Sequence, residues 1–186
     1  ATPLLVPFVV IGLIGVAGAG GLLLTQGYRM ERITVWLDPA ASEKGHQTIQ
    51  GLYAIGSGGL FGKGLGQSMQ KLGFLPEANN DMIFSVICEE LGLFGALCVL
   101  ALFFALIWRF MVIAVNAPDL YGSMIVVGVI AHIGIQVFIN IAVATNTIPN
   151  TGIPLPFISY GGSSLVFMLL EMGLVLSVSR YINVKK

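Results

Sequence analysis

The sequence is poor in charge and almost free of cysteine. Of its 186 residues only 10% are charged, and only two are cysteines. Cys88 and Cys98 lie in or beside one apolar segment. This spacing fits neither a disulfide framework nor a metal-binding motif, so we expect both to be packing residues. Nine basic and nine acidic side chains give no net charge, which implies neither nucleic acid nor an anionic surface as a partner.

Long apolar runs dominate what remains. Apolar residues make up 56% of the chain, and the mean hydropathy is +0.90. A helix that spans a bilayer needs about 20 mostly apolar residues. Segments 1–24, 83–110, 121–145 and 163–181 meet or nearly meet that length. We therefore predict an all-α polytopic membrane protein with about four transmembrane helices and one long extracytoplasmic loop.

The first apolar segment, Ala1–Leu24, does not have the composition of a signal peptide. It has no basic region at its start, does not begin with Met, and contains Pro3 and Pro7. A cleaved leader would combine a basic start with an uninterrupted apolar stretch. We expect this segment to be a spanning helix and the chain to begin inside a larger protein.

Lysine and arginine predict the orientation, because short cytoplasmic loops carry an excess of both. Arg109 follows the second helix, Arg180 and two further lysines follow the fourth, and segment 146–162 has no basic residue. These two helices are therefore expected to end in the cytoplasm, with 146–162 and the long segment 25–81 outside. Five basic residues within 25–81 argue the other way, but long loops count less in this rule.

The long loop 25–81 has the composition of an ordered segment. Loops of this length are usually functional or disordered, and this one is amphipathic rather than polar and repetitive. Arg32–Leu37 carries Trp36, a residue type that collects at membrane interfaces, and Gln47–Ile55 has the pattern of a short helix. We expect the loop to pack back over the outer ends of the helices.

A glycine-rich stretch, Gly56–Gly66, holds six glycines and Lys63. It is not a P-loop, because the lysine is misplaced and no Ser/Thr opens a following helix. Glycines let backbone approach a ligand closely, and an ammonium beside backbone N–H groups suits phosphate. A pyrophosphate site with Lys63 and a flexible re-entrant turn are both compatible with this pattern.

Two carboxylates, Glu77 and Asp81, lie four residues apart just before the second helix. Partial desolvation of Asp81 raises its proton affinity, as a general base requires. Both acids also suit helix capping, and together they could hold a divalent cation such as Mg²⁺ or Mn²⁺. Deeper in the same helix, one of Glu89 and Glu90 should face protein or water. For that pair, hydrogen bonding between helices is favoured over catalysis.

A polar stripe runs along the third helix, where His132, Gln136 and Asn140 recur every fourth residue. Such side chains usually hydrogen-bond across helices, and lining a substrate cavity is the alternative. Glu171 is the deepest acid of the fourth helix, where an intramembrane acid is a functional hypothesis by default. His132 is one candidate to satisfy it.

Three serines flank the start of the fourth helix: Ser159, Ser163 and Ser164. A serine nucleophile with His132 as base is poorly supported, since no third orienting group or strand–turn–helix context accompanies it. The backbone N–H groups at this helix start instead suit phosphate.

Taken together, these segments resemble the SEDS family of polytopic bacterial proteins, FtsW, RodA and SpoVE. The similarity rests on RITVWLDP at 32–39, the stretch 47–66, LPEANNDMIF at 75–84, EELG at 89–92, the pair Gln136 and Asn140, and GIPLPFISYGGSS at 152–164. Asn80 is more typical of FtsW or SpoVE than of RodA. Met82, His46 and Gly51 stand where the family usually has Phe, Tyr and Ser, and the match covers only the C-terminal part of a larger helical bundle.

The resemblance implies a peptidoglycan glycosyltransferase that polymerises lipid II, a disaccharide-pentapeptide on undecaprenyl pyrophosphate. The family's essential acid aligns with Asp81. The enzyme would work outside the bacterial cytoplasmic membrane, in septum synthesis during division or sporulation, together with a class B penicillin-binding protein and other divisome proteins. We expect Asp81 to be the general base of an inverting reaction. The expected substrate contacts are Glu77, Lys63, Gln47, Gln50, Ser159, Ser163 and Ser164, with Gln136 and Asn140 lining the cavity.

Two other functions remain open at this level. A lipid II flippase without bond-making chemistry would depend on His132, Gln136 and Glu171 at mid-depth rather than on Asp81. A non-catalytic scaffold for the penicillin-binding protein would depend on no single acid. The sequence does not separate the division enzyme from its sporulation and elongation relatives.

Overall fold

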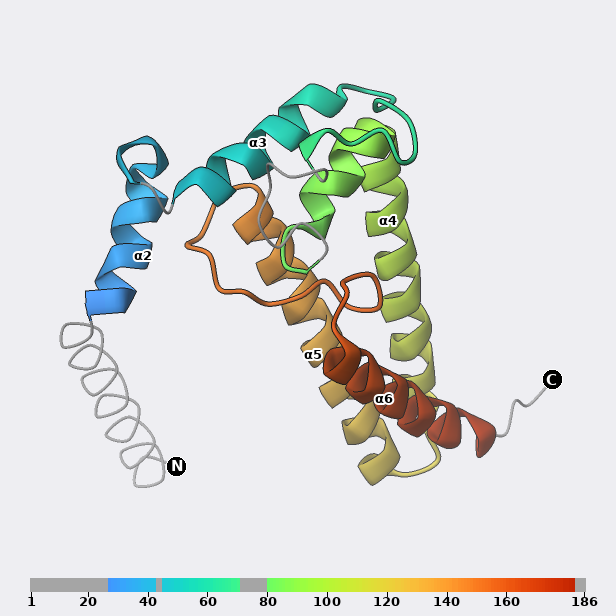
Figure 1. Cartoon of the computed structure of the whole chain (residues 1–186). Helices are drawn as coiled ribbons and strands as arrows, with labels where there is room; N and C mark the ends of the chain where they lie inside the picture. Colours follow the sequence, from blue (N-terminus) through green and yellow to red (C-terminus); the bar gives the residue numbers. More distant parts are fainter. Residues whose placement is uncertain (1–26, 43–44, 71–79, 183–186) are drawn as a thin grey trace.

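The computed structural model describes residues 27–42, 45–70 and 80–182, and the elements within these residues are all helices (Figure 1). In chain order they are α2 (Gly27–Leu37), the 3₁₀ turn η1 (Pro39–Ala41), α3 (His46–Gly58), α4 (Ile83–Val115), α5 (Leu120–Ala144) and α6 (Gly162–Arg180).

Three of these helices, α4, α5 and α6, are long and apolar enough to cross a membrane. Helix α4 runs to Val115, past the expected end at residue 110, because residues 111–115 are still apolar and compatible with a helix. Pro118 and Asp119 follow, and the Asp119 carboxylate accepts a hydrogen bond from Gly122 N at 3.3 Å to start α5. The fourth expected span, 1–24, lies outside the described residues.

The core lies where α4, α5 and α6 meet. Helices α4 and α5 run antiparallel, and α6 crosses them (Figure 1). Buried side chains from all three form one apolar cluster that includes Phe103, Phe110, Val126, Ile133, Met168 and Val175. Cys88 belongs to this cluster, whereas Cys98 is exposed, so only the first of the two cysteines is a packing residue. Burial of these groups removes apolar surface from water or lipid and fixes the helix pairing.

Outside this bundle, α3 lies across the ends of α4 and α5 (Figure 1). Its buried face consists of small residues, among them Gly51, Ala54 and Gly58. A Cβ atom at Gly58 would overlap the backbone of Cys88, so glycine here lets the two helices come into backbone contact. The described parts of the segment 25–81 therefore contain two α-helices and the turn η1, and α3 continues through Gly58 into the glycine-rich stretch.

Candidate functional site

Asp81 lies directly before α4 and is only 9% exposed. From α3, Gln47 Nε2 donates a hydrogen bond to Asp81 Oδ1 at 3.4 Å. The side chain is thus held in a protein environment, as the sequence predicted for a partly desolvated carboxylate. A carboxylate is one of the groups that can accept a proton from a bound hydroxyl group in general-base catalysis.

Asn140 fixes the backbone at Asp81. Its Nδ2 donates to Asp81 O at 2.8 Å and to Ile153 O at 2.9 Å, and its side chain is 1% exposed. Asn140 therefore joins the N-terminal end of α4 to the loop that follows α5. These bonds agree with the hydrogen-bonding role favoured for the polar stripe, and the lining of a substrate cavity by Asn140 stays a prediction.

Ser159 holds the residue before Asp81. Its Oγ donates to Asn80 O at 2.6 Å and accepts from Leu155 N at 2.7 Å. Two chain segments 79 residues apart are therefore joined by one hydroxyl group. The structure brings Gln47, Asn140 and Ser159 together around residues 80 and 81, as a site built on these motifs requires.

The loop after α5 also binds α2. Arg32 Nη1 donates to Asn150 O at 2.7 Å, and Trp36 Nε1 donates to Asn146 O at 2.9 Å. Asn150 Nδ2 in turn donates to Gln47 Oε1 at 3.3 Å. Helices α2 and α3 and this loop therefore form one hydrogen-bonded unit that ends at Asp81.

Helix α4 is interrupted at Gly92, whose φ of 67° and ψ of −166° are not helical. The glycine-rich loop supplies hydrogen bonds on both sides of this break. Leu93 N donates to Gly59 O at 2.9 Å, and Lys63 N donates to Glu89 O at 2.9 Å. A Cβ at Gly92 would overlap the loop backbone. The glycines of the loop thus allow its backbone to lie in close contact with α4. Gly92 itself has a positive φ, a conformation in which other residues are strained.

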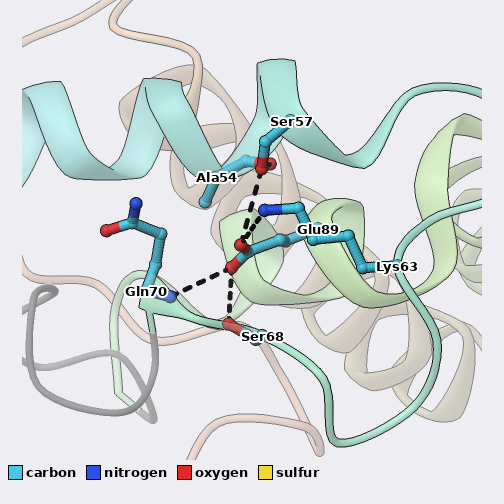
Figure 2. Close-up of polar contacts among 6 residues, drawn as sticks. All are labelled: Ala54, Ser57, Lys63, Ser68, Gln70 and Glu89. Atoms are coloured by element: carbon cyan, nitrogen blue, oxygen red, sulfur yellow. Dashed lines mark hydrogen bonds and ion pairs between the residues drawn. The ribbon is translucent and has the colours of Figure 1, made fainter.

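Glu89 is the centre of a second polar cluster, shown in Figure 2. Its side chain is fully buried, and Lys63 Nζ lies 2.7 Å from Oε1. Ser68 Oγ donates to Oε2 at 2.5 Å, and Gln70 N donates to the same atom at 3.4 Å. Ser57 Oγ donates to Oε1 at 3.5 Å. Buried charge requires such partners. Glu89 therefore has a hydrogen-bonding role, but three of these four partners belong to residues 63–70 and one, Ser57, to α3, whereas the sequence favoured bonding between helices.

Lys63, the expected pyrophosphate ligand, is therefore engaged in an ion pair with Glu89 rather than gathered with Asp81. Its contact with phosphate remains an untested prediction, as do those of Gln50 on α3 and of Ser163 and Ser164 in the first turn of α6. Glu77 lies outside the described residues. Over the ranges that the structure describes, no three His, Cys, Asp or Glu residues gather as a metal site, and the proposed pair of Glu77 and Asp81 is not tested.

Within the bundle, His132 Nδ1 lies 2.7 Å from Glu171 Oε1, which joins α5 to α6. Their side chains are 44% and 23% exposed. The expected partnership of His132 with Glu171 is therefore present. The polar stripe is not uniform, however, because Asn140 is buried at Asp81 while His132 is exposed.

Sequence reasoning did not assign Arg32 or Asn150 to the site. In the sequence, Arg32 belongs to an amphipathic segment, and Asn150 belongs to a loop that contains three prolines. The hydrogen bonds from Arg32 to Asn150 and from Asn150 to Gln47 each join residues more than a hundred positions apart in the sequence. For Asn150, the available signal was its place directly after Pro149, whose ring restricts the backbone there.

Comparison with known proteins adds the family. The family model described as "Cell cycle protein", which covers FtsW, RodA and SpoVE, matches residues 2–184. "Stage V sporulation protein E" of Bacillus subtilis (strain 168) is 56% identical over 178 residues, which are 94% of this chain and 48% of that protein. "Probable peptidoglycan glycosyltransferase FtsW" of Geobacter sp. (strain M18) is 43% identical, over 91% of this chain and 47% of that protein. The chain spans about half the length of the curated relatives it matches.

Solved structures show the same fold. The structure described as "Structural coordination of polymerization and crosslinking by a peptidoglycan synthase complex" superposes with a TM-score of 0.69 at 28% identity, covering 96% of this chain and 50% of that chain. The crystal structure of the rod shape determining protein RodA of Thermus thermophilus gives a TM-score of 0.54 at 38% identity, covering 70% of this chain and 39% of that chain.

Proposed function

Because this chain belongs to the FtsW/RodA/SpoVE family of cell cycle proteins, we propose that it is the C-terminal part of a peptidoglycan glycosyltransferase that polymerises lipid II. The observation that carries the proposal is Asp81, a carboxylate 9% exposed whose Oδ1 accepts from Gln47. The names of the FtsW relatives support the reaction class. The site would face the outer side of the bacterial cytoplasmic membrane.

In this reaction Asp81 is the general base. The 4-hydroxyl of the acceptor sugar gives its proton to the Asp81 carboxylate while its oxygen attacks the anomeric carbon of the growing chain. The bond from that carbon to the pyrophosphate oxygen breaks, and undecaprenyl pyrophosphate leaves with the electron pair. An α-linked donor becomes a β-linked product, so one base and one displacement with inversion are sufficient.

The neighbours of Asp81 hold it for this step. Gln47 orients the carboxylate through the hydrogen bond from its Nε2 to Oδ1. Asn140 and Ser159 fix the backbone of residues 80 and 81 from two different elements. Preorganisation of this kind lowers the cost of reaching the reactive geometry.

The test is lipid II polymerisation by the purified full-length protein with Asp81→Asn. Asn keeps the shape but cannot accept the proton, so we expect a loss of roughly a hundred- to ten-thousand-fold, with membrane insertion unchanged. Asp119→Asn is the matched control, because Asp119 caps α5 and Asn caps about as well as Asp. Equal polymer yields from wild type and Asp81→Asn would end the catalytic proposal.

A second candidate, a lipid II flippase, is favoured by one observation. His132 and Glu171 form an ion-pair geometry at 2.7 Å within two membrane-crossing helices, and such groups often mark transport pathways. Glu171→Gln should then stop lipid II translocation in vesicles while Asp81→Asn leaves it intact. The opposite pattern, with polymerisation lost only in Asp81→Asn, supports the enzyme.

A class B penicillin-binding protein is the partner that we propose. The support is the fold shared with a peptidoglycan synthase complex described as coordinating polymerization and crosslinking. Co-purification of the full-length protein with such a partner from detergent-solubilised membranes tests it, and Asp81→Asn should leave the association unchanged.

A further inference from the structure

A cavity of about 150 Å³ lies between α2, α3 and the loop that follows α5. The described residues that line it come from all three segments: Glu31, Arg32, Val35, Trp36, Gln47, Thr48, Asn146 and Asn150. None of the reaction steps above uses this cavity, although Gln47 belongs to both it and the Asp81 site.

Two of the lining residues offer apolar surface. Val35 and Trp36 line the cavity from α2. The indole N–H of Trp36 is already donated to Asn146 O at 2.9 Å. A ligand would therefore contact the apolar surface of the Trp36 ring rather than its N–H group.

Four other lining residues are polar and neutral: Gln47, Asn146 and Asn150, which carry amides, and Thr48, which carries a hydroxyl. An amide carries both donors and acceptors, and a hydroxyl carries both as well. The bond from Asn150 Nδ2 to Gln47 Oε1 at 3.3 Å orients two of these amides before any ligand arrives. Such an arrangement matches a ligand rich in hydroxyl or acetamido groups.

The charges that line the cavity balance, with one guanidinium from Arg32 and one carboxylate from Glu31. Arg32 also donates to Asn150 O. Among the described lining residues there is thus no excess of positive charge to attract a pyrophosphate dianion. A neutral polar ligand fits better.

The cavity is one side chain away from Asp81. Gln47 lines the cavity and its Nε2 reaches Asp81 Oδ1 at 3.4 Å. Its volume is comparable to engineered cavities of about 150 Å³ that hold one six-membered carbon ring. A pyranose ring has apolar C–H faces and a polar rim, and the lining residues include partners for both.

We propose that this cavity is a saccharide subsite, which holds one N-acetylated sugar ring of the acceptor next to Asp81. The proposal rests on the glycosyltransferase function proposed above and adds to it the residues that recognise the sugar. Trp36 and Val35 contact a face of the ring, while Thr48, Gln47 and Asn150 bind its polar substituents.

The test measures equilibrium binding, so it does not depend on catalysis. The full-length protein carrying Asp81→Asn is placed in nanodiscs and titrated with two probes. One is undecaprenyl-pyrophosphate-linked disaccharide without peptide, and the other is undecaprenyl pyrophosphate. The two probes differ only in the sugars.

Two variants change the cavity, each with a matched control elsewhere. Thr48→Val removes the lining hydroxyl, and Thr34→Val makes the same change on an exposed residue of α2. Trp36→Leu removes the indole, and Trp108→Leu does so at an exposed position of α4. Thermal unfolding in detergent checks that all four variants are folded.

We expect each cavity variant to weaken binding of the disaccharide probe about three- to tenfold, the range of one lost neutral hydrogen bond or contact. Binding of undecaprenyl pyrophosphate should not change, and the two control variants should bind both probes as tightly as the protein that carries Asp81→Asn alone.

Unchanged disaccharide binding, or an equal loss for both probes, would overturn the subsite. If the wild type prefers the disaccharide probe through these residues but makes no polymer, the subsite stands and the glycosyltransferase function fails.

Discussion

The ammonium group of Lys63 lies 2.7 Å from Oε1 of Glu89, whose side chain is completely buried. This pair ties the glycine-rich loop to α4, close to the break in that helix. Glu89 also accepts from Ser68 and Gln70. The carboxylate of Glu89 and its donors therefore hold the loop in place together with the backbone hydrogen bonds on both sides of Gly92.

Lys63→Met should destabilise the protein, because it leaves the buried carboxylate without its cation. Breaking a buried pair typically costs about 3–5 kcal/mol, and we expect the lower end because the Lys63 side chain is 34% exposed. The double variant Lys63→Met with Glu89→Gln should recover part of the loss, since no charge remains buried. Thermal unfolding in detergent measures both, with exposed Arg109→Met as the control. A double variant less stable than Lys63→Met would contradict this account.

Gly92→Ala should unfold at lower temperature than the wild type. Gly92 has a φ of 67°, and an added Cβ would meet the backbone of Leu60 and Gly62. Left-handed backbone alone costs a non-glycine residue roughly 1–2 kcal/mol, and the overlap adds to it. Gly128→Ala in α5 is the control, because its added Cβ meets nothing within 4 Å. Equal unfolding temperatures for the two variants would show that the break tolerates a side chain.

Asn140→Asp should lower both stability and polymerisation. The change replaces a donor that serves two carbonyl oxygens with an acceptor, and each buried group left unpaired costs about 1–3 kcal/mol. Asn116→Asp makes the same change at an exposed helix end, where Nδ2 donates to Val112 O at 2.7 Å. That variant should be close to the wild type in unfolding temperature and polymer yield. Full activity in Asn140→Asp would show that Asp81 is positioned by other contacts.

Ser159→Ala should reduce polymerisation by displacing Asn80 and Asp81. It removes the hydroxyl that binds Asn80 O and Leu155 N, at a cost of about 1–3 kcal/mol in stability. If Ser159 acts by positioning Asp81, the maximal rate should fall more than lipid II binding. Ser179→Ala, which removes a bond to Leu176 O in the last turns of α6, should leave both unchanged. A selective loss of binding with an intact rate would assign Ser159 to substrate contact.

The helices were largely predictable from the sequence. The ends of α5 and α6 lie within one residue of the expected positions, because apolar runs between polar turns set them. The end of α4 was expected too early, at residue 110, because Arg109 was taken to mark it, whereas a basic residue marks the membrane boundary rather than the last helical turn. The short helix at Gln47–Ile55 was found in α3, whose continuation into glycines could not be predicted from helix propensity.

The candidate site was predictable in its centre and not in its surroundings. Asp81 was identified by two features, its place before an apolar run and the family motif. The partnership of Lys63 with Glu89 was missed, because the glycine pattern suggested a phosphate ligand and nothing local showed that the loop meets α4. Contacts such as Arg32 with Asn150 join residues 118 positions apart, so they depend on tertiary packing.

The break in α4 also links two events in membrane insertion. Backbone groups left unpaired in hydrocarbon are costly, and around Gly92 they are paired by residues 59–64 of the preceding loop. Helix α4 therefore reaches its final form only when this loop has folded against it. The first part of α4, which follows the proposed general base Asp81, and the glycine-rich loop consequently form together rather than one after the other.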